Sequence, residues 1–188
     1  MKATNSSKSK KKKKSESSVY LWVIKVFFLA IAISAVLSLA SETVLSGADV
    51  VVAVLILAAF ICLGIVFDIV GVAVTAADAK PFHSMASHKA KGAKEALGLI
   101  RNADHVSSIC NDVVGDICGI VSGTTGAVIV LQLQQALNTT TVLVSVAVTA
   151  LISGLTIGGK AMGKNLAMKQ SKKVVYLAGR FLHLFNRK

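Results

Sequence analysis

Residues 50–77 decide the fold: they read VVVAVLILAAFICLGIVFDIVGVAVTAA, and Asp68 is the only charged residue among them. A helix that crosses a bilayer needs about 20 consecutive, mainly apolar residues, each adding about 1.5 Å to its length. This run is longer than that. It therefore predicts a transmembrane helix whose inner turns tilt, break or protrude from the membrane.

Three further apolar segments predict three more spans. They run from about Val19 to Ala40, from about Val106 to Leu131 and from about Val142 to Gly158. The composition agrees, because 54% of the 188 residues are hydrophobic and 16% are charged, whereas soluble domains have about 45–50% and about 25%. We therefore predict an all-α polytopic membrane protein with four transmembrane helices.

The first segment also has two features of a signal peptide, which are a basic start and the sequence SLA ending at Ala40. Its apolar stretch exceeds the roughly 7–15 residues of a signal-peptide core. We expect it to remain as an extra N-terminal transmembrane helix over residues 19–41. Residues 1–18 contain seven lysines and no apolar stripe, and we expect them to form a disordered basic tail.

The basic residues predict the orientation of the spans. The connectors 41–49 and 132–141 contain no lysine or arginine, whereas residues 1–18, 79–105 and 160–188 hold twenty of the twenty-one. Basic connectors stay on the cytoplasmic side. We therefore expect a multi-pass protein of the plasma membrane with both termini in the cytoplasm.

Two inner segments predict amphipathic helices at the membrane surface. Residues 80–104 alternate apolar and basic positions at helical spacing, as one helix or as two broken near Gly92, and residues 166–186 show a similar pattern. Such helices bind the membrane interface. We expect anionic lipid headgroups, not nucleic acid, as their partners. With the spans between them they form a three-span membrane domain over residues 49–188.

Oxygen-bearing side chains gather near the inner ends of the second and third segments. Carboxylates inside a bilayer are costly and normally face protein, water or a cation. Carboxylate, amide and hydroxyl oxygens suit hard cations such as Mg²⁺ or Na⁺. The same pattern fits acids that are hydrated at the interface or paired with lysines, so both interpretations remain open. The candidate ligands are Thr75, Asp78, Ser108, Asn111, Asp112 and Asp116, whereas Asp68 lies deeper in the second segment.

Signatures of catalysis are not visible in the sequence. It contains no HExxH motif, no phosphate-binding glycine loop and no set of serine, histidine and aspartate at a known spacing. The three cysteines lie in apolar surroundings without zinc-site spacing. We therefore do not expect an enzyme.

The order of these pieces resembles the transmembrane domain of the CorB/CorC and cyclin-M magnesium transporters, known as domain of unknown function 21. Four stretches carry the resemblance: VAVTAAD (72–78), HKAKGAKEALGLIRNADHV (88–106), SSICNDVVGD (107–116) and GKAMGKNLAMKQSKKVVYLAGRFLHL (159–184). They are similar to the end of the family's first span, its juxtamembrane segment, the start of its second span, and the end of its last span with the following helix. From about Val50 onwards, the resemblance covers about 140 residues.

The resemblance implies a homodimer that moves Mg²⁺ by alternating access, coupled to Na⁺. Carried over by position, it implicates Thr75, Asp78, Asn111 and Gly159 in the Mg²⁺ site. The family's glutamate in its Gly-Glu-x-x-Pro motif is replaced by Lys160, and its proline by Gly163. We expect this domain to lack the family's cytosolic regulatory domains, because no segment of the sequence resembles them.

Two main functions follow as hypotheses. The first is a divalent-cation (Mg²⁺-like) transporter or exporter domain, in which Asp112 and Asp116 compensate for the lost glutamate. The alternative is a non-transporting membrane scaffold or regulator in which Lys160 plugs the ion site as a built-in counter-ion. A third interpretation is a lipid-surface sensor that uses the lysine-rich tail.

Overall fold

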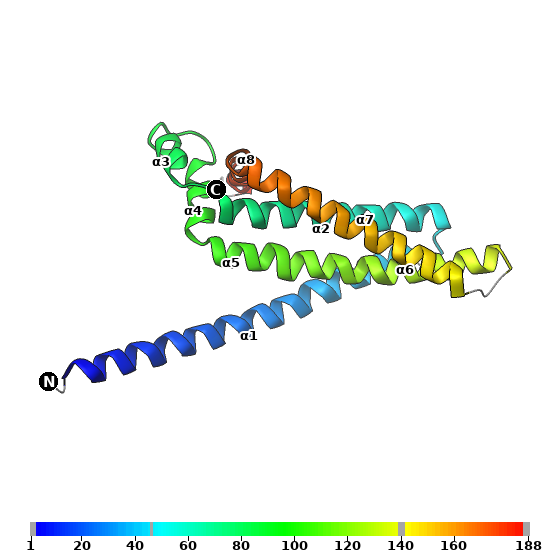
Figure 1. Cartoon of the computed structure of the whole chain (residues 1–188), viewed down its shortest axis with the longest axis horizontal. Helices are drawn as coiled ribbons and strands as arrows, with labels where there is room; N and C mark the ends of the chain where they lie inside the picture. The colour runs from blue at the N-terminus through cyan, green and yellow to red at the C-terminus, as the bar shows by residue number, and fades with distance from the viewer. Residues whose placement is uncertain (1–2, 46, 139–141, 186–188) are drawn as a thin grey trace.

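The computed structural model describes the backbone of residues 3–45, 47–138 and 142–185, and the side chains in those ranges from Tyr20 onwards. Within these ranges the secondary structure is helical (Figure 1). The helices are α1 (Ala3–Leu45), α2 (Val50–Ala76), α3 (Lys80–Ser87), α4 (Ala93–Arg101), α5 (Ala103–Ser108), the π-helix η1 (Ile109–Gly115), α6 (Asp116–Ala136), α7 (Val142–Lys169) and α8 (Ser171–Phe185).

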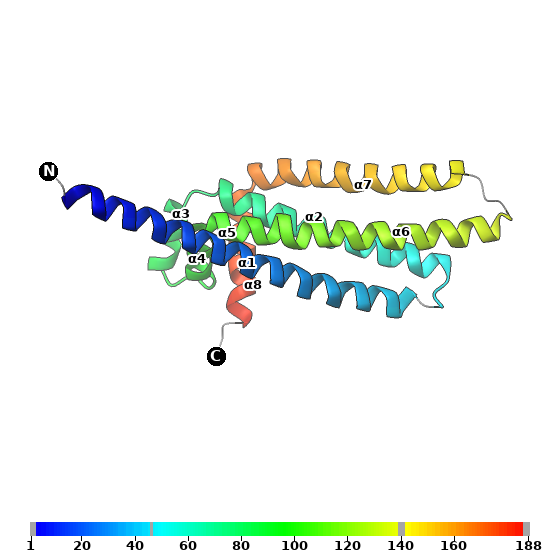
Figure 2. The same ribbon diagram turned by 90° about the horizontal axis from the view of Figure 1, so that it is seen from below.

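Four stretches are long and apolar enough to cross a membrane, which confirms the predicted number of spans. They are Tyr20–Leu45, Val50–Ala76, Ala103–Ala136 and Val142–Lys169. The third is a continuous rod made of α5, η1 and α6 (Figure 2). Three spans end later than the sequence predicts, because α1 continues to Leu45, α6 to Ala136 and α7 to Lys169. The described part of the chain is therefore an all-α protein with four membrane-length helices.

Helices α2, α6 and α7 form the centre of the bundle (Figures 1 and 2). Towards the end that carries the connectors 41–49 and 132–141, which the sequence predicts to be the outer end, Ala53 and Leu57 of α2 pack with Ile129 of α6 and Ile152 of α7. Gly126 allows this packing, because a β-carbon there would lie 2.6 Å from Ile152 Cδ1. The three helices thus meet through a small apolar cluster.

Helix α1 packs against the third rod and diverges from the bundle towards its N-terminus (Figure 1). Its side chains Val26, Ala30, Ile33 and Leu37 contact a buried cluster on η1 and α6 that includes Val121. The backbone of α1 extends back to Ala3, whereas the sequence predicts a disordered basic tail over residues 1–18. Lysine is a good helix former, and the apolar part of α1 supplies the nucleus that a helix needs.

Helices α3, α4 and α8 cover the opposite end of the bundle, which the sequence predicts to be the inner end, and α8 runs across the direction of the long helices (Figure 2). Phe82 of α3 is fully buried there, in a cluster with Val74 and Val175. The predicted break at Gly92 is present, with a φ of +85°. The predicted helix 166–186 is divided instead, because the chain bends at Gln170 between α7 and α8.

Candidate functional site

A row of small and polar residues on α2 faces the π-helix. A β-carbon on Gly64 would lie 3.2 Å from Cys118 Cβ, and one on Gly71 would overlap the side chain of Asn111. Asp68 comes four residues after Gly64 and three before Gly71, so it lies on the same side of α2. The third rod therefore approaches α2 closely on both sides of an aspartate, through Cys118 of α6 at Gly64 and through Asn111 of η1 at Gly71.

Asp68 is buried within the span, with 7% of its surface exposed. Its Oδ2 atom has no hydrogen-bond partner among the described residues. A buried carboxylate without a partner is unfavourable in a protein interior and more so in a bilayer. The position therefore calls for a compensating group, such as a cation or water.

The π-helix η1 places Asn111 against Gly71, on the same side of α2 as Asp68. Asn111 Nδ2 donates a hydrogen bond to Ser107 Oγ at 3.2 Å, whereas its Oδ1 atom is buried without a partner in the described chain. π-helical turns are uncommon and often occur at functional sites. Asp68 and Asn111 thus each have a buried oxygen that the described protein leaves unsatisfied.

Lys160 reaches this region from α7. Gly159 and Gly163 bring α7 close to α2, because β-carbons there would crowd Ile65 and Ile69. The Nζ atom of Lys160 lies 3.5 Å from the carbonyl oxygen of Gly115, at the end of η1, and can donate a long hydrogen bond to it. Within the described ranges Lys160 forms no salt bridge with an aspartate or glutamate.

The structure does not gather the ligand set that the sequence predicts. Thr75 and Asp78 are exposed; Thr75 Oγ1 donates to Val72 O at 2.9 Å, and Asp78 Oδ1 accepts from Lys80 N at 3.0 Å. The described residues contain no group of three or more His, Cys, Asp or Glu side chains placed to hold a metal. Of the predicted ligands, Asn111 is the one that lies against the Gly64–Asp68–Gly71 row of α2.

The remaining predicted residues are divided between the surface and the helix interfaces. Asp112 and Asp116, which the sequence predicts on one helical face, are both exposed. Ser108 is half-buried. Gly159 is also half-buried and packs on Ile65, so it serves the contact between α7 and α2.

Asp68 is the residue that the predicted site omits. Its signal in the sequence was its isolation, because it is the only charge in the most apolar span. Gly64 and Gly71 provided a second signal, since small residues at helical spacing allow close approach in a membrane. Nothing in the sequence indicated that Gly71 on this side of α2 packs against Asn111.

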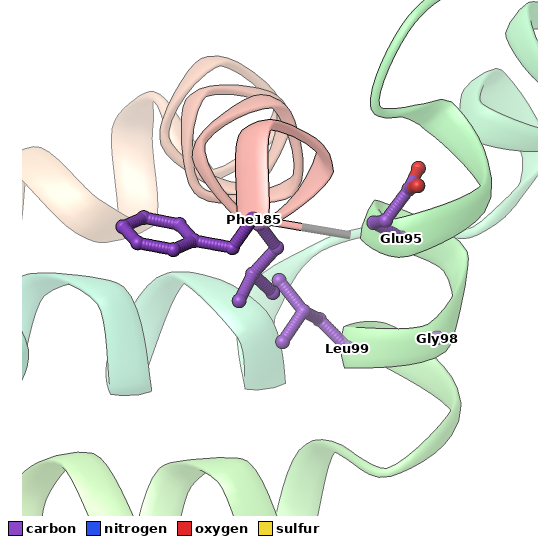
Figure 3. A pocket seen from close by; sticks show the side chains of 5 residues that line it. Glu95, Gly98, Leu99 and Phe185 are labelled. Atoms are coloured by element: carbon purple, nitrogen blue, oxygen red, sulfur yellow. The ribbon is translucent and has the colours of Figure 1, made fainter. Parts of the chain in front are cut away.

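A separate cavity of about 410 Å³ lies between α4 and α8 and is lined by Glu95, Gly98, Leu99, Leu182 and Phe185. Leu99 and Phe185 border the same space, and the Glu95 carboxylate points away from them (Figure 3). That carboxylate lies 2.7 Å from His183 Nδ1. The cavity is therefore a mainly apolar hollow at the inner end of the molecule.

Comparisons of the chain with protein-family models, curated proteins and solved structures find no match. The chemistry of the buried row therefore carries the functional argument. Asp68 offers a carboxylate, Asn111 an amide oxygen and Gly115 a carbonyl oxygen near the ammonium group of Lys160. Such oxygens are ligands for hard cations, so this arrangement can bind either a metal cation or the ammonium group itself.

Proposed function

We propose that this chain is an integral membrane transporter or exporter domain for a divalent, Mg²⁺-like cation, with Asp68 as its anionic ligand. The observation that carries the proposal is the buried, unpartnered Oδ2 atom of Asp68 inside a span. Asn111 supports it, because a second unsatisfied oxygen lies on the facing π-helix. The order of α2, the inner helices, the third rod, α7 and α8 is also what the CorB/CorC and cyclin-M resemblance implies.

The proposed orientation has both termini in the cytoplasm of a multi-pass plasma-membrane protein. It rests on the basic residues of the connectors, since those near α3, α4 and α8 are rich in lysine and arginine and the connectors 41–49 and 132–141 contain none. Helix α8 suits contact with anionic lipid headgroups. It exposes Leu177 and Phe181 beside the basic Arg180 and runs across the long helices (Figure 2).

A homodimer is part of the proposal. Asp112 and Asp116 are exposed on the third rod, and β-carbons on Gly119 and Gly123 would meet nothing within 4 Å. Carboxylates that face lipid are costly, and small residues favour close helix contact. A second copy covering this face would remove the cost.

The decisive experiment compares Asp68→Asn with Asp104→Asn. Both replace a carboxylate by an amide of the same shape, but Asp68 is buried and unpartnered, whereas Asp104 is exposed on α5. In detergent, millimolar Mg²⁺ should raise the thermal unfolding midpoint of the wild type and of Asp104→Asn, and should have little effect on Asp68→Asn. Mg²⁺ flux into liposomes, followed with a trapped fluorescent indicator, should show the same order. A wild type without a Mg²⁺-dependent shift would contradict the proposal.

A second candidate is a non-transporting scaffold or regulator, and the contact between Lys160 Nζ and Gly115 O favours it. An ammonium group held at that carbonyl would occupy the place of a metal cation and repel one electrostatically. In this case the oxygens of the row would serve to position Lys160.

Lys160→Glu separates the two candidates, with Lys164→Glu on the exposed side of α7 as the matched control. A plugged site should gain Mg²⁺ affinity when the ammonium group is replaced by a carboxylate. A working transporter should instead lose flux, because the site would hold its cation too tightly to release it. The control should leave both measurements close to those of the wild type.

A further inference from the structure

The unsatisfied polar atoms of the described residues follow one interface. They are Asp68 Oδ2 on α2, Asn111 Oδ1 on η1, and Ser122 Oγ and Gln132 Oε1 on α6. All four residues belong to α2 or to the third rod, which pack against each other. Buried polar atoms without partners are few in folded proteins, and each requires an explanation.

The four residues lie at successive depths along the contact between α2 and the third rod, which we call the polar seam. Asn111 lies against Gly71 near the inner end. Ser122 follows Cys118 by four residues, and Cys118 faces Gly64, so Ser122 lies on the same side of α6. Gln132 lies at the outer end, where its Nε2 atom donates to Ala48 O at 2.9 Å.

The polar seam is long enough to cross a bilayer. Asn111 and Gln132 are separated by 21 positions in the sequence, which corresponds to roughly 30 Å of helix, the thickness of the hydrocarbon core. Thr125, which lies between Asn111 and Gln132 in the sequence, is buried but has a hydrogen-bonded hydroxyl, which donates to Val121 O at 2.8 Å. Ser122 is as deeply buried, at 2% exposure, but lacks such a bond.

We propose that the polar seam is a hydrated path that admits water and small cations between the Asp68 site and the outer face. Water bonded to these four atoms would satisfy each of them. In this structure the seam is tight at Gly64, where a β-carbon would lie 3.2 Å from Cys118 Cβ. Gly64 and Gly71 place no side chain of α2 between the two helices at these levels, so a local widening is enough to admit water.

The role of the inner end rests on the proposed cation site, whereas hydration of the outer half does not. The probe for the outer half is the silver ion, a small cation that reacts with thiols. Ser122→Cys and Val121→Cys form a matched pair at the same depth, in a chain whose three native cysteines are replaced by alanine. Ser122 lies on the polar seam, and Val121 lies in the apolar cluster against α1.

The chain is reconstituted in nanodiscs in nitrate buffer and exposed to silver nitrate. The thiols that remain are counted by alkylation in denaturant and mass spectrometry. A hydrated seam predicts that Ser122→Cys reacts at least about tenfold faster than Val121→Cys, because a charged ion avoids dry protein. Equal rates, or no reaction at either position, would overturn the proposal.

A second measurement keeps the native cysteines. In a dry seam, Ser122→Ala would remove an unsatisfied hydroxyl and raise the thermal midpoint. In a hydrated seam, the same substitution would lose hydrogen bonds to water and leave the midpoint unchanged or lower. A raised midpoint therefore counts against the path. Failure of Asp68→Asn to alter Mg²⁺ binding would reject the cation site and leave the silver result for Ser122 intact.

Discussion

The side chain of Asn111 lies so close to Gly71 that a β-carbon on residue 71 would overlap its amide oxygen. No side chain of α2 separates the two helices at this point. The contact fixes where the unsatisfied oxygen of Asn111 lies relative to Asp68, and it provides the first prediction.

Gly71→Ala should displace the Asn111 amide and weaken cation binding. The methyl group would overlap Asn111 Oδ1 and lie 2.8 Å from its Cγ, so the amide must move. The Mg²⁺-dependent rise in the thermal midpoint should shrink. Gly98→Ala is the control, because its β-carbon would meet nothing within 4 Å and alanine favours a helix by about 1 kcal/mol over glycine. Equal Mg²⁺ responses in the two variants would contradict the prediction.

Gly179→Ala should loosen α8 from α4. A β-carbon on Gly179 would lie 2.5 Å from Gly92 O and 2.8 Å from Ala96 N, and backbone atoms cannot move aside as a flexible side chain can. Crowding of this kind typically costs about 1–3 kcal/mol. Limited proteolysis should cut α8 faster than in the wild type, with Gly98→Ala again as the control. An unchanged cleavage rate would show that the helices adjust to the methyl group.

The contact between Glu95 of α4 and His183 of α8 should make stability depend on acid pH. The hydrogen bond with His183, followed by that of the Glu95 backbone N–H, lowers the pKa of the Glu95 carboxyl below its usual range. The stabilisation is therefore fully present above the ordinary glutamate pKa of about 4.3. It is lost as the pH falls through the lowered folded-state value.

Thermal midpoints of the wild type and of Glu95→Gln, measured across this acid range, test that prediction. The wild type should be the more stable protein above the ordinary glutamate pKa, and the difference should shrink as the pH falls. Glu42→Gln, which alters an exposed carboxylate on α1, should show a much weaker pH dependence. A constant difference for Glu95→Gln would exclude a role for its ionised form.

Phe82→Ala should destabilise the inner end of the molecule. The ring is fully buried with Val74 and Val175, and truncation of a buried phenylalanine typically costs about 3–5 kcal/mol. Phe28→Ala is the matched control, because 64% of Phe28 is exposed on α1. Chemical denaturation in mild detergent should show a large loss for the first variant and little for the second. Similar losses would mean that α3 is not anchored by its phenylalanine.

The spans were predictable from the sequence because length and hydropathy alone determine whether a helix can cross a bilayer. The run from Val50 to Ala77 differs from α2 by one residue at its end. The break at Gly92 was also predictable, since a positive φ favours glycine. The division at Gln170 was not, because apolar periodicity continues on both sides of it.

The candidate site was less predictable because it depends on which helical faces meet. Asp112 and Asp116 share a face, but periodicity cannot tell whether a face points inwards. Thr75 and Asp78 lie near the end of α2, where the chain leaves the bundle to begin α3. Asp68 stood out as an isolated charge, yet only the packing of α2 on η1 shows that Asn111 lies against Gly71, about one turn of α2 from Asp68.

The π-helix η1 changes the helical phase of the apolar pattern along the third rod. A π turn holds an additional residue compared with an α turn, so the apolar pattern of α5 and that of α6 are out of phase by about one position. Removing a single residue between 109 and 115 would restore one continuous α-helical phase, and Asn111 and Val121 could not then both keep their present faces. The additional residue of the π turn therefore allows Asn111 to face α2 while Val121 faces α1.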